Sequence, residues 1–146
     1  MPLRLLAALS APLLLSCDTV ECSLEDCPAE GVTLTLDHAT WAPGTYQLEV
    51  IADGTSYACS LTVPSSNISA QYCGNGGVVL VGIDTTTGAP VDIYLDGDEV
   101  EQITVNLTLD GAALANAEYA VVWDKTYPNG PGCPPPCYEA RTTISF

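Results

Sequence analysis

The sequence predicts an all-β fold: a single antiparallel β-sandwich of seven to eight strands. Three observations predict it. Apolar and polar residues alternate with a period of two in several stretches of the chain. Asp-Gly pairs, which are typical of hairpin turns, separate some of these stretches. No stretch sustains the apolar period of a helix, and turns recur at roughly the 8–12-residue spacing of sandwich folds.

The first three strands are expected at residues 31–38, 45–52 and 55–63, and Asp53-Gly54 joins the last two as a hairpin. Alternation places the apolar side chains of each strand on one face. The residues expected to face the core are Val32, Leu34, Leu36, Tyr46, Leu48, Val50, Tyr57, Cys59, Leu61 and Val63.

A turn-rich segment, residues 64–77, then leads to the continuous apolar run VVLVGI at 78–83. Such a run predicts a strand that is buried on both faces. A short strand and an Asp-Gly turn follow in VDIYLDGDEV at 91–100.

The next expected strand, 102–109, is joined by Asp110-Gly111 to residues 112–127. Its inward residues are Ile103, Val105, Leu107 and Leu109, and in 112–127 Tyr119, Val121 and Trp123 share a face. The alanine-rich start of 112–127 is also compatible with a helical turn, but the hairpin signal and the β-branched end favour a strand. Residues 137–146 close the domain.

Two local patterns resemble known sandwich modules. The stretch WAPGTYQLEV at 41–50 resembles extracellular immunoglobulin-like and prealbumin-like domains. Tyr57 and Cys59 are similar to the tyrosine corner of immunoglobulin domains. No Cys–Trp–Cys spacing accompanies them, so an antibody-type domain is not supported.

The N-terminus predicts export. Arg4 precedes a short apolar run that is too short to span a bilayer, which needs about 20 residues, and is typical of a secretory signal. The run ends in Leu14-Leu15-Ser16-Cys17, which resembles the bacterial lipobox. The resemblance implies cleavage before Cys17 and lipidation of its sulfur. The alternative is an ordinary signal peptide followed by a chance cysteine.

These features divide the chain into a lipoprotein signal peptide (1–16), a short acidic tether with Cys22 and Cys27 (17–30) and the sandwich domain (31–146). After loss of Arg4 the chain has two basic and 18 acidic residues, a net charge of −16. Nucleic-acid binding and electrostatic docking on anionic lipid both need more cations than this. The expected contact with the membrane is the lipid anchor alone.

Cysteine usage predicts disulfides, because an exported chain meets an oxidising environment. Lipidation of Cys17 leaves an even set of six: Cys22, Cys27, Cys59, Cys73, Cys133 and Cys137. A four-cysteine zinc site is the alternative.

The spacing of the cysteines restricts their pairing. Three prolines between Cys133 and Cys137, if extended, hold the two Cα atoms about 12 Å apart, beyond the roughly 7 Å of a disulfide. We therefore expect each to bond to one of Cys22 and Cys27, with the choice open, and Cys59 to pair with Cys73.

The pattern as a whole resembles uncharacterised lipoproteins of predatory soil bacteria of the myxobacterial type. The shared features are the paired-cysteine start CSLEDC, the GTYQLEV strand with its Asp-Gly hairpin, and PNGPGCPPPC before the last strand. The resemblance covers most of residues 17–146 and implies no particular activity.

Catalytic and metal-binding signals are weak. His38 is the single histidine and has no neighbouring nucleophile motif, so we interpret it as an ordinary turn residue. An acidic hairpin is a weak calcium candidate without the EF-hand glycine; its residues are Asp92, Asp96, Asp98, Glu99 and Glu101. CGNGGVV precedes a strand rather than a helix, which argues against a phosphate cradle.

Two further patterns have ordinary explanations. Asn67 and Asn106 match glycosylation sequons, which a bacterial lipobox makes accidental. Trp41 and Trp123 are candidates for a sugar-stacking platform, with packing in the core as the alternative.

We expect a non-enzymatic interaction or structural module in the bacterial envelope, on the inner or outer membrane, that binds no cofactor and no nucleic acid. A protein or glycan is its expected partner. A calcium- or carbohydrate-binding domain and a carboxylate-based envelope hydrolase are the alternatives.

Overall fold

The computed structural model describes residues 22, 27, 30–38, 40–65, 68–97, 99–131 and 133–146. These residues form ten strands and no helix. The strands are β1 (Gly31–Asp37), β2 (Gly44–Ala52), β3 (Thr55–Val63), β4 (Ala70–Cys73), β5 (Val79–Ile83), β6 (Pro90–Leu95), β7 (Gln102–Leu109), β8 (Ala112–Ala120), β9 (Asp124–Thr126) and β10 (Cys137–Ser145).

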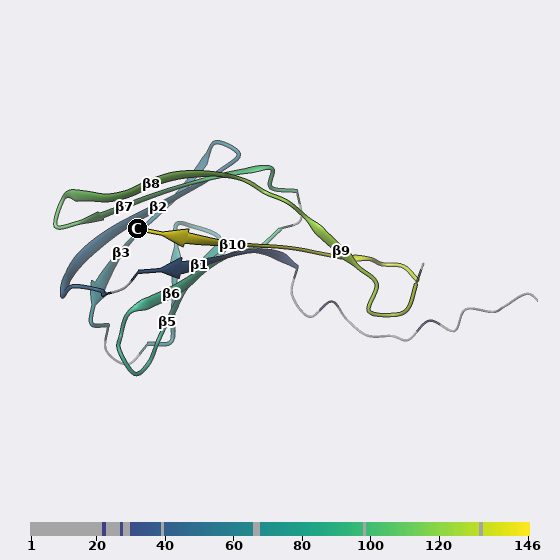
Figure 1. Ribbon diagram of the computed structural model, residues 1–146, viewed down its shortest axis with the longest axis horizontal. Coiled ribbons are helices and arrows are strands. Elements are labelled where there is room, and N and C mark those ends of the chain that lie inside the picture. The colour runs from purple at the N-terminus through teal and green to yellow at the C-terminus, as the bar shows by residue number, and fades with distance from the viewer. Residues whose placement is uncertain are drawn as a thin grey trace, which may run out of the picture.

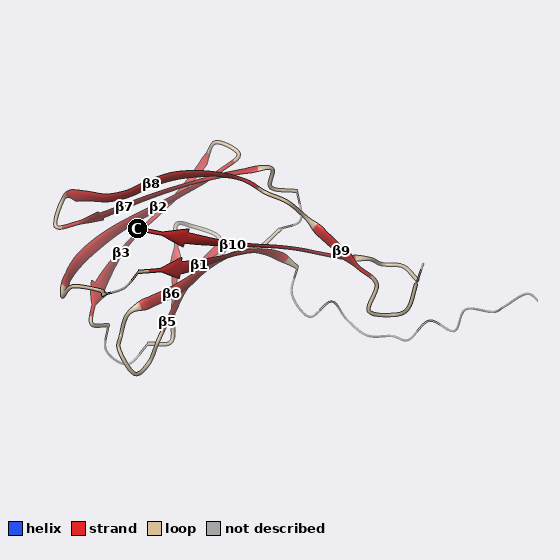
Figure 2. Cartoon of the chain, in the orientation of Figure 1, coloured by secondary structure: helices blue, strands red, loops and turns tan. Residues whose placement is uncertain are grey.

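The strands form two sheets that pack face to face, which confirms the predicted all-β sandwich (Figures 1 and 2). The larger sheet has the order β4-β5-β6-β1-β10-β9, and the smaller has the order β3-β2-β7-β8. The strand count exceeds the expected seven to eight, because the short strands β4 and β9 carry little alternation that could be seen in the sequence.

β1 and β10, the first and last strands along the chain, are neighbours in the large sheet and pair in parallel. Their register runs from Gly31 opposite Glu139 to Asp37 opposite Ser145. The sequence predicted an antiparallel sandwich, and this is the one parallel pair among the described strands. A hairpin signal predicts only antiparallel neighbours. β1 and β10 lie at opposite ends of the sequence, so no turn motif between them could predict whether they pair in parallel or antiparallel.

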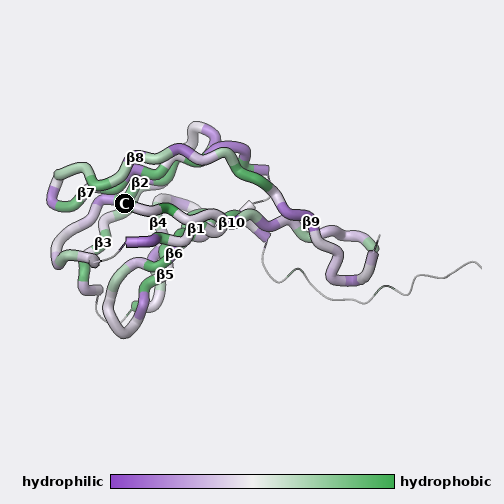
Figure 3. Tube along the Cα trace, viewed as in Figure 1, coloured by the Kyte–Doolittle hydropathy of each residue, from purple (hydrophilic) through white to green (hydrophobic). Residues whose placement is uncertain are grey.

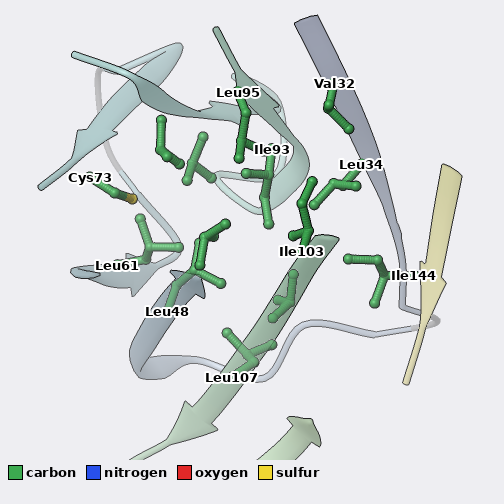
Figure 4. Packing of buried hydrophobic residues seen from close by; sticks show 14 of the residues in the cluster. Val32, Leu34, Leu48, Leu61, Cys73, Ile93, Leu95, Ile103, Leu107 and Ile144 are labelled. Carbon is green, nitrogen blue, oxygen red and sulfur yellow. The ribbon is translucent and has the colours of Figure 1, made fainter. Parts of the chain in front are cut away.

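The core lies between the two sheets, and the predicted inward faces supply most of it. Apolar and polar residues alternate along the strands (Figure 3). Leu48, Leu61 and Leu107 of the small sheet point toward Leu34 and Ile93 of the large sheet (Figure 4). Tyr57 and Cys59 have the expected direction but are only partly buried, because β3 is an edge strand.

The run at 78–83 is not buried on both faces as expected. Val79, Val81 and Ile83 face the core, whereas Leu80 and Gly82 are half-buried on the outer face of the large sheet. No second layer covers this face within the described residues. The continuous apolar run therefore predicted the burial of the inward positions correctly, but not the partial exposure of the outward ones.

The sandwich has two ends with different connections. At the end that we call the clamp end lie the β2–β3 turn, the β6–β7 segment and the loop 127–136 between β9 and β10. The backbone N–H of Asp53 in the β2–β3 turn donates to the carbonyl of Gln102 at the start of β7, and that of Val121, just after β8, donates to the carbonyl of Glu101. In Figure 1 the loop between β9 and β10 projects from this end.

The opposite end, the distal end, holds the β1–β2 segment (38–43), the β3–β4 segment (64–69), the β5–β6 loop (84–89) and the β7–β8 turn. The backbone N–H of Asp110 donates to the carbonyl of Thr45, and that of Ser65 donates to the carbonyl of Gly88.

Three disulfides link the described cysteines, as the sequence predicted. The choice that the sequence left open is resolved as Cys22–Cys133 and Cys27–Cys137, with Cα–Cα distances of 5.7 and 5.4 Å. Both bonds lie at the clamp end. We call them the clamp disulfides, because they attach the N-terminal segment to the loop before β10 and to the first residue of β10.

The third bond, Cys59–Cys73, joins β3 of the small sheet to β4 of the large sheet. The reason we gave for separating Cys133 from Cys137 needs correction, although each does bond elsewhere. The backbone bends at Pro134 and Pro135, so the three prolines are not one extended segment.

Within the described residues there is no helix with the length and hydropathy needed to cross a membrane.

Candidate binding pocket

A pocket of about 310 Å³ opens at the distal end of the sandwich. Three segments that are far apart in the sequence line it: the β1–β2 segment, the end of β3 and the β5–β6 loop. Its lining residues are Thr40, Trp41, Val63, Thr87 and Ala89.

Trp41 is held in place by an aromatic cluster that consists of His38, Trp41, Tyr46 and Phe146. The indole meets the rings of Tyr46, His38 and Phe146 edge to face, at centroid distances of 5.1, 5.1 and 5.5 Å. Such edge-to-face contacts are favourable because the positive ring edge meets the negative ring face. The pocket wall formed by Trp41 is therefore fixed by its neighbours.

Two hydrogen bonds fix the cluster to the backbone. The ring of Tyr46 is completely buried, and its hydroxyl donates to the carbonyl of Ala42 at 2.9 Å. His38 Nδ1–H donates to the carbonyl oxygen of Phe146 at 2.7 Å, and the two rings stack at 4.7 Å. The β1–β2 segment is thus tied both to β2 and to the residue that follows β10.

The bond from Tyr46 also corrects the interpretation of Tyr57. The hydroxyl that reaches back to the backbone a few residues upstream, as in a tyrosine corner, belongs to Tyr46. The Tyr57 ring instead lies beside Gly74, where an added Cβ would approach it to 3.1 Å.

Within the described residues, no hydrogen bond is made by the indole N–H of Trp41. Among the described residues every buried side-chain nitrogen and oxygen has a partner, and no hydrogen bond involves Trp41 Nε1 there. This N–H is therefore not a buried one. Trp123 differs, since its Nε1–H donates to the carbonyl of Val100 at 2.9 Å.

The β5–β6 loop is shaped by Asp84. One carboxylate oxygen of Asp84 accepts the backbone N–H groups of Thr86 and Thr87 at 2.6 and 3.1 Å. These bonds favour the ionised form, so they lower the pKa of Asp84 below its ordinary value. The loop is closed by the backbone N–H of Gly88, which donates to the Asp84 carbonyl at 2.7 Å.

The backbone at position 88, at the end of the β5–β6 loop, requires a glycine. Its φ is +67°, and an added Cβ would lie 2.5 and 2.6 Å from the backbone O and N of Ser65. No side chain fits there, because the β5–β6 loop and the β3–β4 segment touch through their backbones. The β5–β6 loop, which carries the lining residues Thr87 and Ala89, is therefore held against the β3–β4 segment by a close backbone contact.

The lining of the pocket is aromatic and aliphatic, with two hydroxyl groups. Trp41, Val63 and Ala89 supply the apolar surface, and Thr40 and Thr87 supply the hydroxyls. The backbone N–H of Ala89 reaches Thr87 Oγ1 at 3.4 Å, so the Thr87 hydroxyl proton can turn toward a ligand. None of the lining residues is charged.

The two tryptophans do not form one sugar-stacking platform. Trp41 lies beside Tyr46, which is opposite Leu109 at the end of β7, whereas Trp123 bonds to Val100 just before β7 begins. They therefore occupy opposite ends of the sandwich. Both pack partly against the core, and Trp41 alone lines the pocket.

The described residues of the acidic hairpin do not come together as a calcium site. Asp98 lies outside the described residues. In this part of the chain the single group of three possible ligands is Cys27, Glu30 and Cys137. The two cysteines of this group are bonded to each other, so they offer no thiolates to a metal. The disulfides likewise replace the alternative zinc site.

The remaining candidates are ordinary or lie outside the description. Asn106 is within β7, where its side-chain amide donates to Glu49 at 2.9 Å. Asn67, the signal segment 1–16 and the lipidation candidate Cys17 lie outside the described residues.

No protein-family model, curated protein or solved structure matches the chain.

Proposed function

We propose that the chain is a lipid-anchored lipoprotein of the bacterial cell envelope and acts as a non-enzymatic binding module. The lipid is carried by Cys17, on either the inner or the outer membrane. The binding surface is the distal pocket. The resemblance to myxobacterial-type lipoproteins belongs to the same proposal.

The observation that carries this proposal is the position of the clamp disulfides. They bind the N-terminal segment at the end of the sandwich opposite the pocket. Cys22 follows Cys17 by five residues, which span at most about 17 Å. A lipid on Cys17 therefore keeps the clamp end near the membrane.

The pocket then faces away from the bilayer. Strands of nine residues, such as β2 and β3, extend over about 30 Å from one end of the sandwich to the other. A ligand at the distal end would be reached without contact with lipid headgroups.

Cysteine use agrees with lipidation. The chain has seven cysteines, and the three disulfides use six of them. Cys17 is the seventh. A thiol that has no partner in an oxidising compartment invites unwanted exchange, and acylation removes it.

A binding role suits the pocket better than catalysis does. General acid–base or nucleophilic catalysis needs a titratable or nucleophilic group within reach of the ligand. The lining supplies aromatic, aliphatic and hydroxyl groups, and the neighbouring His38 uses Nδ1–H to bind Phe146.

The test is metabolic labelling of cells that express the full chain with an alkyne-tagged palmitate, followed by fractionation. We expect the wild type to take up the label and remain with membranes. Cys17→Ala should lose both properties. Ser16→Ala is the matched control, because it keeps a small residue before the cysteine and should be labelled. An unlabelled wild type, or a membrane-bound Cys17→Ala variant, would contradict the proposal.

A further inference from the structure

We infer that the distal pocket binds a neutral saccharide, whose ring stacks on Trp41. The inference names the ligand class of the proposed binding module and rests on that proposal for its setting. Four features of the pocket favour this ligand: its size, the chemistry of its wall, its lack of charge and the fixed position of its parts.

The size fits one sugar ring or two. The pocket volume of about 310 Å³ is about twice that of a cavity of roughly 150 Å³ that admits benzene. It stands at the lower limit of about 300 Å³ for ligand sites, which excludes a long segment of polymer inside it. The end of a glycan chain can enter, with the rest in solvent.

The wall offers both kinds of surface that a sugar presents. One face of many pyranose rings carries mainly C–H groups, which pack against the π face of an indole. The ring edge carries hydroxyls, which can pair with the hydroxyls of Thr40 and Thr87 and with the Trp41 N–H. An aliphatic ligand would leave these polar groups without partners, at a cost in affinity.

Charge selects against acidic sugars. None of the lining residues could neutralise a carboxylate or phosphate, and the chain without its signal segment has a net charge of −16. A uronic acid would therefore meet repulsion with no compensating ion pair. Neutral hexoses and N-acetylhexosamines avoid this repulsion.

The pocket is organised before the ligand arrives. Trp41 is held by three aromatic rings, and the loop with Thr87 is closed by Asp84 and by the backbone contact at Gly88. Binding then orders few side chains, which reduces its entropic cost. Small ligands with few contacts depend on this saving.

The experiment is a ¹H–¹⁵N NMR titration of the full, lipidated and oxidised chain in a phosphocholine detergent, which itself carries no sugar. The probes are glucose, galactose, mannose and N-acetylglucosamine at millimolar concentrations, with galacturonate as the charged counterpart of galactose. The chain has two tryptophans, so two indole N–H signals report separately on the distal and clamp ends. A Trp123→Phe variant identifies the signal of Trp41.

At least one neutral sugar should shift the Trp41 signal and leave that of Trp123 in place, and galacturonate should bind more weakly than galactose. Thr87→Val should weaken the binding about fivefold through the loss of one hydrogen bond. Thr143→Val, on the exposed outer face of β10, is the matched control and should leave the affinity unchanged.

The inference is overturned if no neutral sugar moves the Trp41 signal, if both tryptophan signals move equally, or if Thr143→Val weakens binding as much as Thr87→Val. Equal affinity for galactose and galacturonate also overturns it. These outcomes are separate from the labelling of Cys17: loss of sugar binding with intact labelling refutes the ligand class and leaves the anchored module standing.

Discussion

Tyr46 shows how one residue can serve both the core and the binding site. Its ring is fully buried between the sheets and makes an edge-to-face contact with Trp41, and its hydroxyl donates to the carbonyl of Ala42. The sequence predicted that Tyr46 faces the core, because it lies in register with Leu48 and Val50. It did not predict the hydroxyl bond, which depends on the path of residues 38–43 above the strand.

We expect Tyr46→Phe to lower the free energy of unfolding by about 1 kcal/mol, since one buried hydrogen bond is lost and the ring remains. Urea unfolding measures this change. The Trp41 fluorescence should also become more solvent-like, because the segment that carries Trp41 is no longer tied to Tyr46. If both the free energy of unfolding and the fluorescence spectrum were unchanged, the hydrogen bond from Tyr46 to Ala42 would not stabilise the fold or position Trp41.

Asp84 gives the pocket loop a pH dependence. Because its pKa in the folded state lies below the ordinary value of about 4, ionised Asp84 stabilises the fold above about pH 4. This stabilisation is lost as the pH falls through the lowered pKa. The effect has the sign expected for a carboxylate that accepts hydrogen bonds in the native state alone.

Asp84→Asn should therefore be less stable than the wild type at pH 7, and this difference should shrink below about pH 4. Thermal unfolding of both proteins between neutral and acidic pH measures the difference and cancels the contributions of the other carboxyl groups. A difference that stays constant, or grows in acid, would show that the Asp84 carboxylate does not hold the loop.

At the scale of the strands, period-two alternation predicted which side chains face the core but not the partners of each strand. It succeeded for β1, β2 and β7 because one face of each is buried and the other is open, so the hydrophobic pattern fixes the register. It misled for the run at 78–83, where the outer positions Leu80 and Gly82 carry no polar signal. β4 and β9 are too short to show a period.

Neighbouring residues of β1 test this assignment of faces. Leu34 is fully buried and opposite Ile93, whereas Thr35 is exposed on the outer face of the same strand. Leu34→Ala should cost about 2–5 kcal/mol through lost burial and the remaining cavity. Thr35→Ala should change the free energy of unfolding by no more than about 0.5 kcal/mol. Comparable losses from the two substitutions, measured by urea unfolding, would contradict the register.

The bond between Cys59 and Cys73 links the edges of the two sheets on one side of the sandwich. The backbone N–H of Gly74 also donates to the carbonyl of Ala58 at 3.2 Å beside it. The sequence predicted this pair by elimination, and the inward direction of Cys59 by alternation.

A Cys59→Ala/Cys73→Ala double variant should be less stable by about 3 kcal/mol, because the unfolded chain gains the freedom of a loop of about 15 residues. Equilibrium unfolding with the clamp disulfides intact measures this loss. A variant as stable as the wild type would show that the edges are held by backbone pairing alone.

At the scale of the whole molecule, the sequence predicted the disulfide framework and missed the pocket. Cysteines can be recognised as disulfide candidates from the sequence of an exported chain alone, and their spacing restricted which of them could pair. The pocket instead depends on how residues 40–41, Val63 and residues 87–89 meet at the distal end, and no local pattern reports such a meeting. Trp41 was the one sequence signal that pointed there.

The clamp disulfides and the parallel pairing of β1 with β10 act on the same two segments. Together they join the beginning and the end of the described chain within the large sheet and at the clamp end. The expected result is a domain whose orientation relative to its N-terminal segment is fixed. Under the proposed lipidation of Cys17, this fixed orientation places the pocket away from the membrane.

The most direct test is mass spectrometry of the protein purified from bacterial membranes without reduction, both intact and after proteolysis. The account predicts a chain that begins at a lipid-modified Cys17, with peptides linked as Cys22–Cys133, Cys27–Cys137 and Cys59–Cys73. An unmodified Cys17, free thiols among the other six cysteines, or a Cys133–Cys137 bond would contradict it.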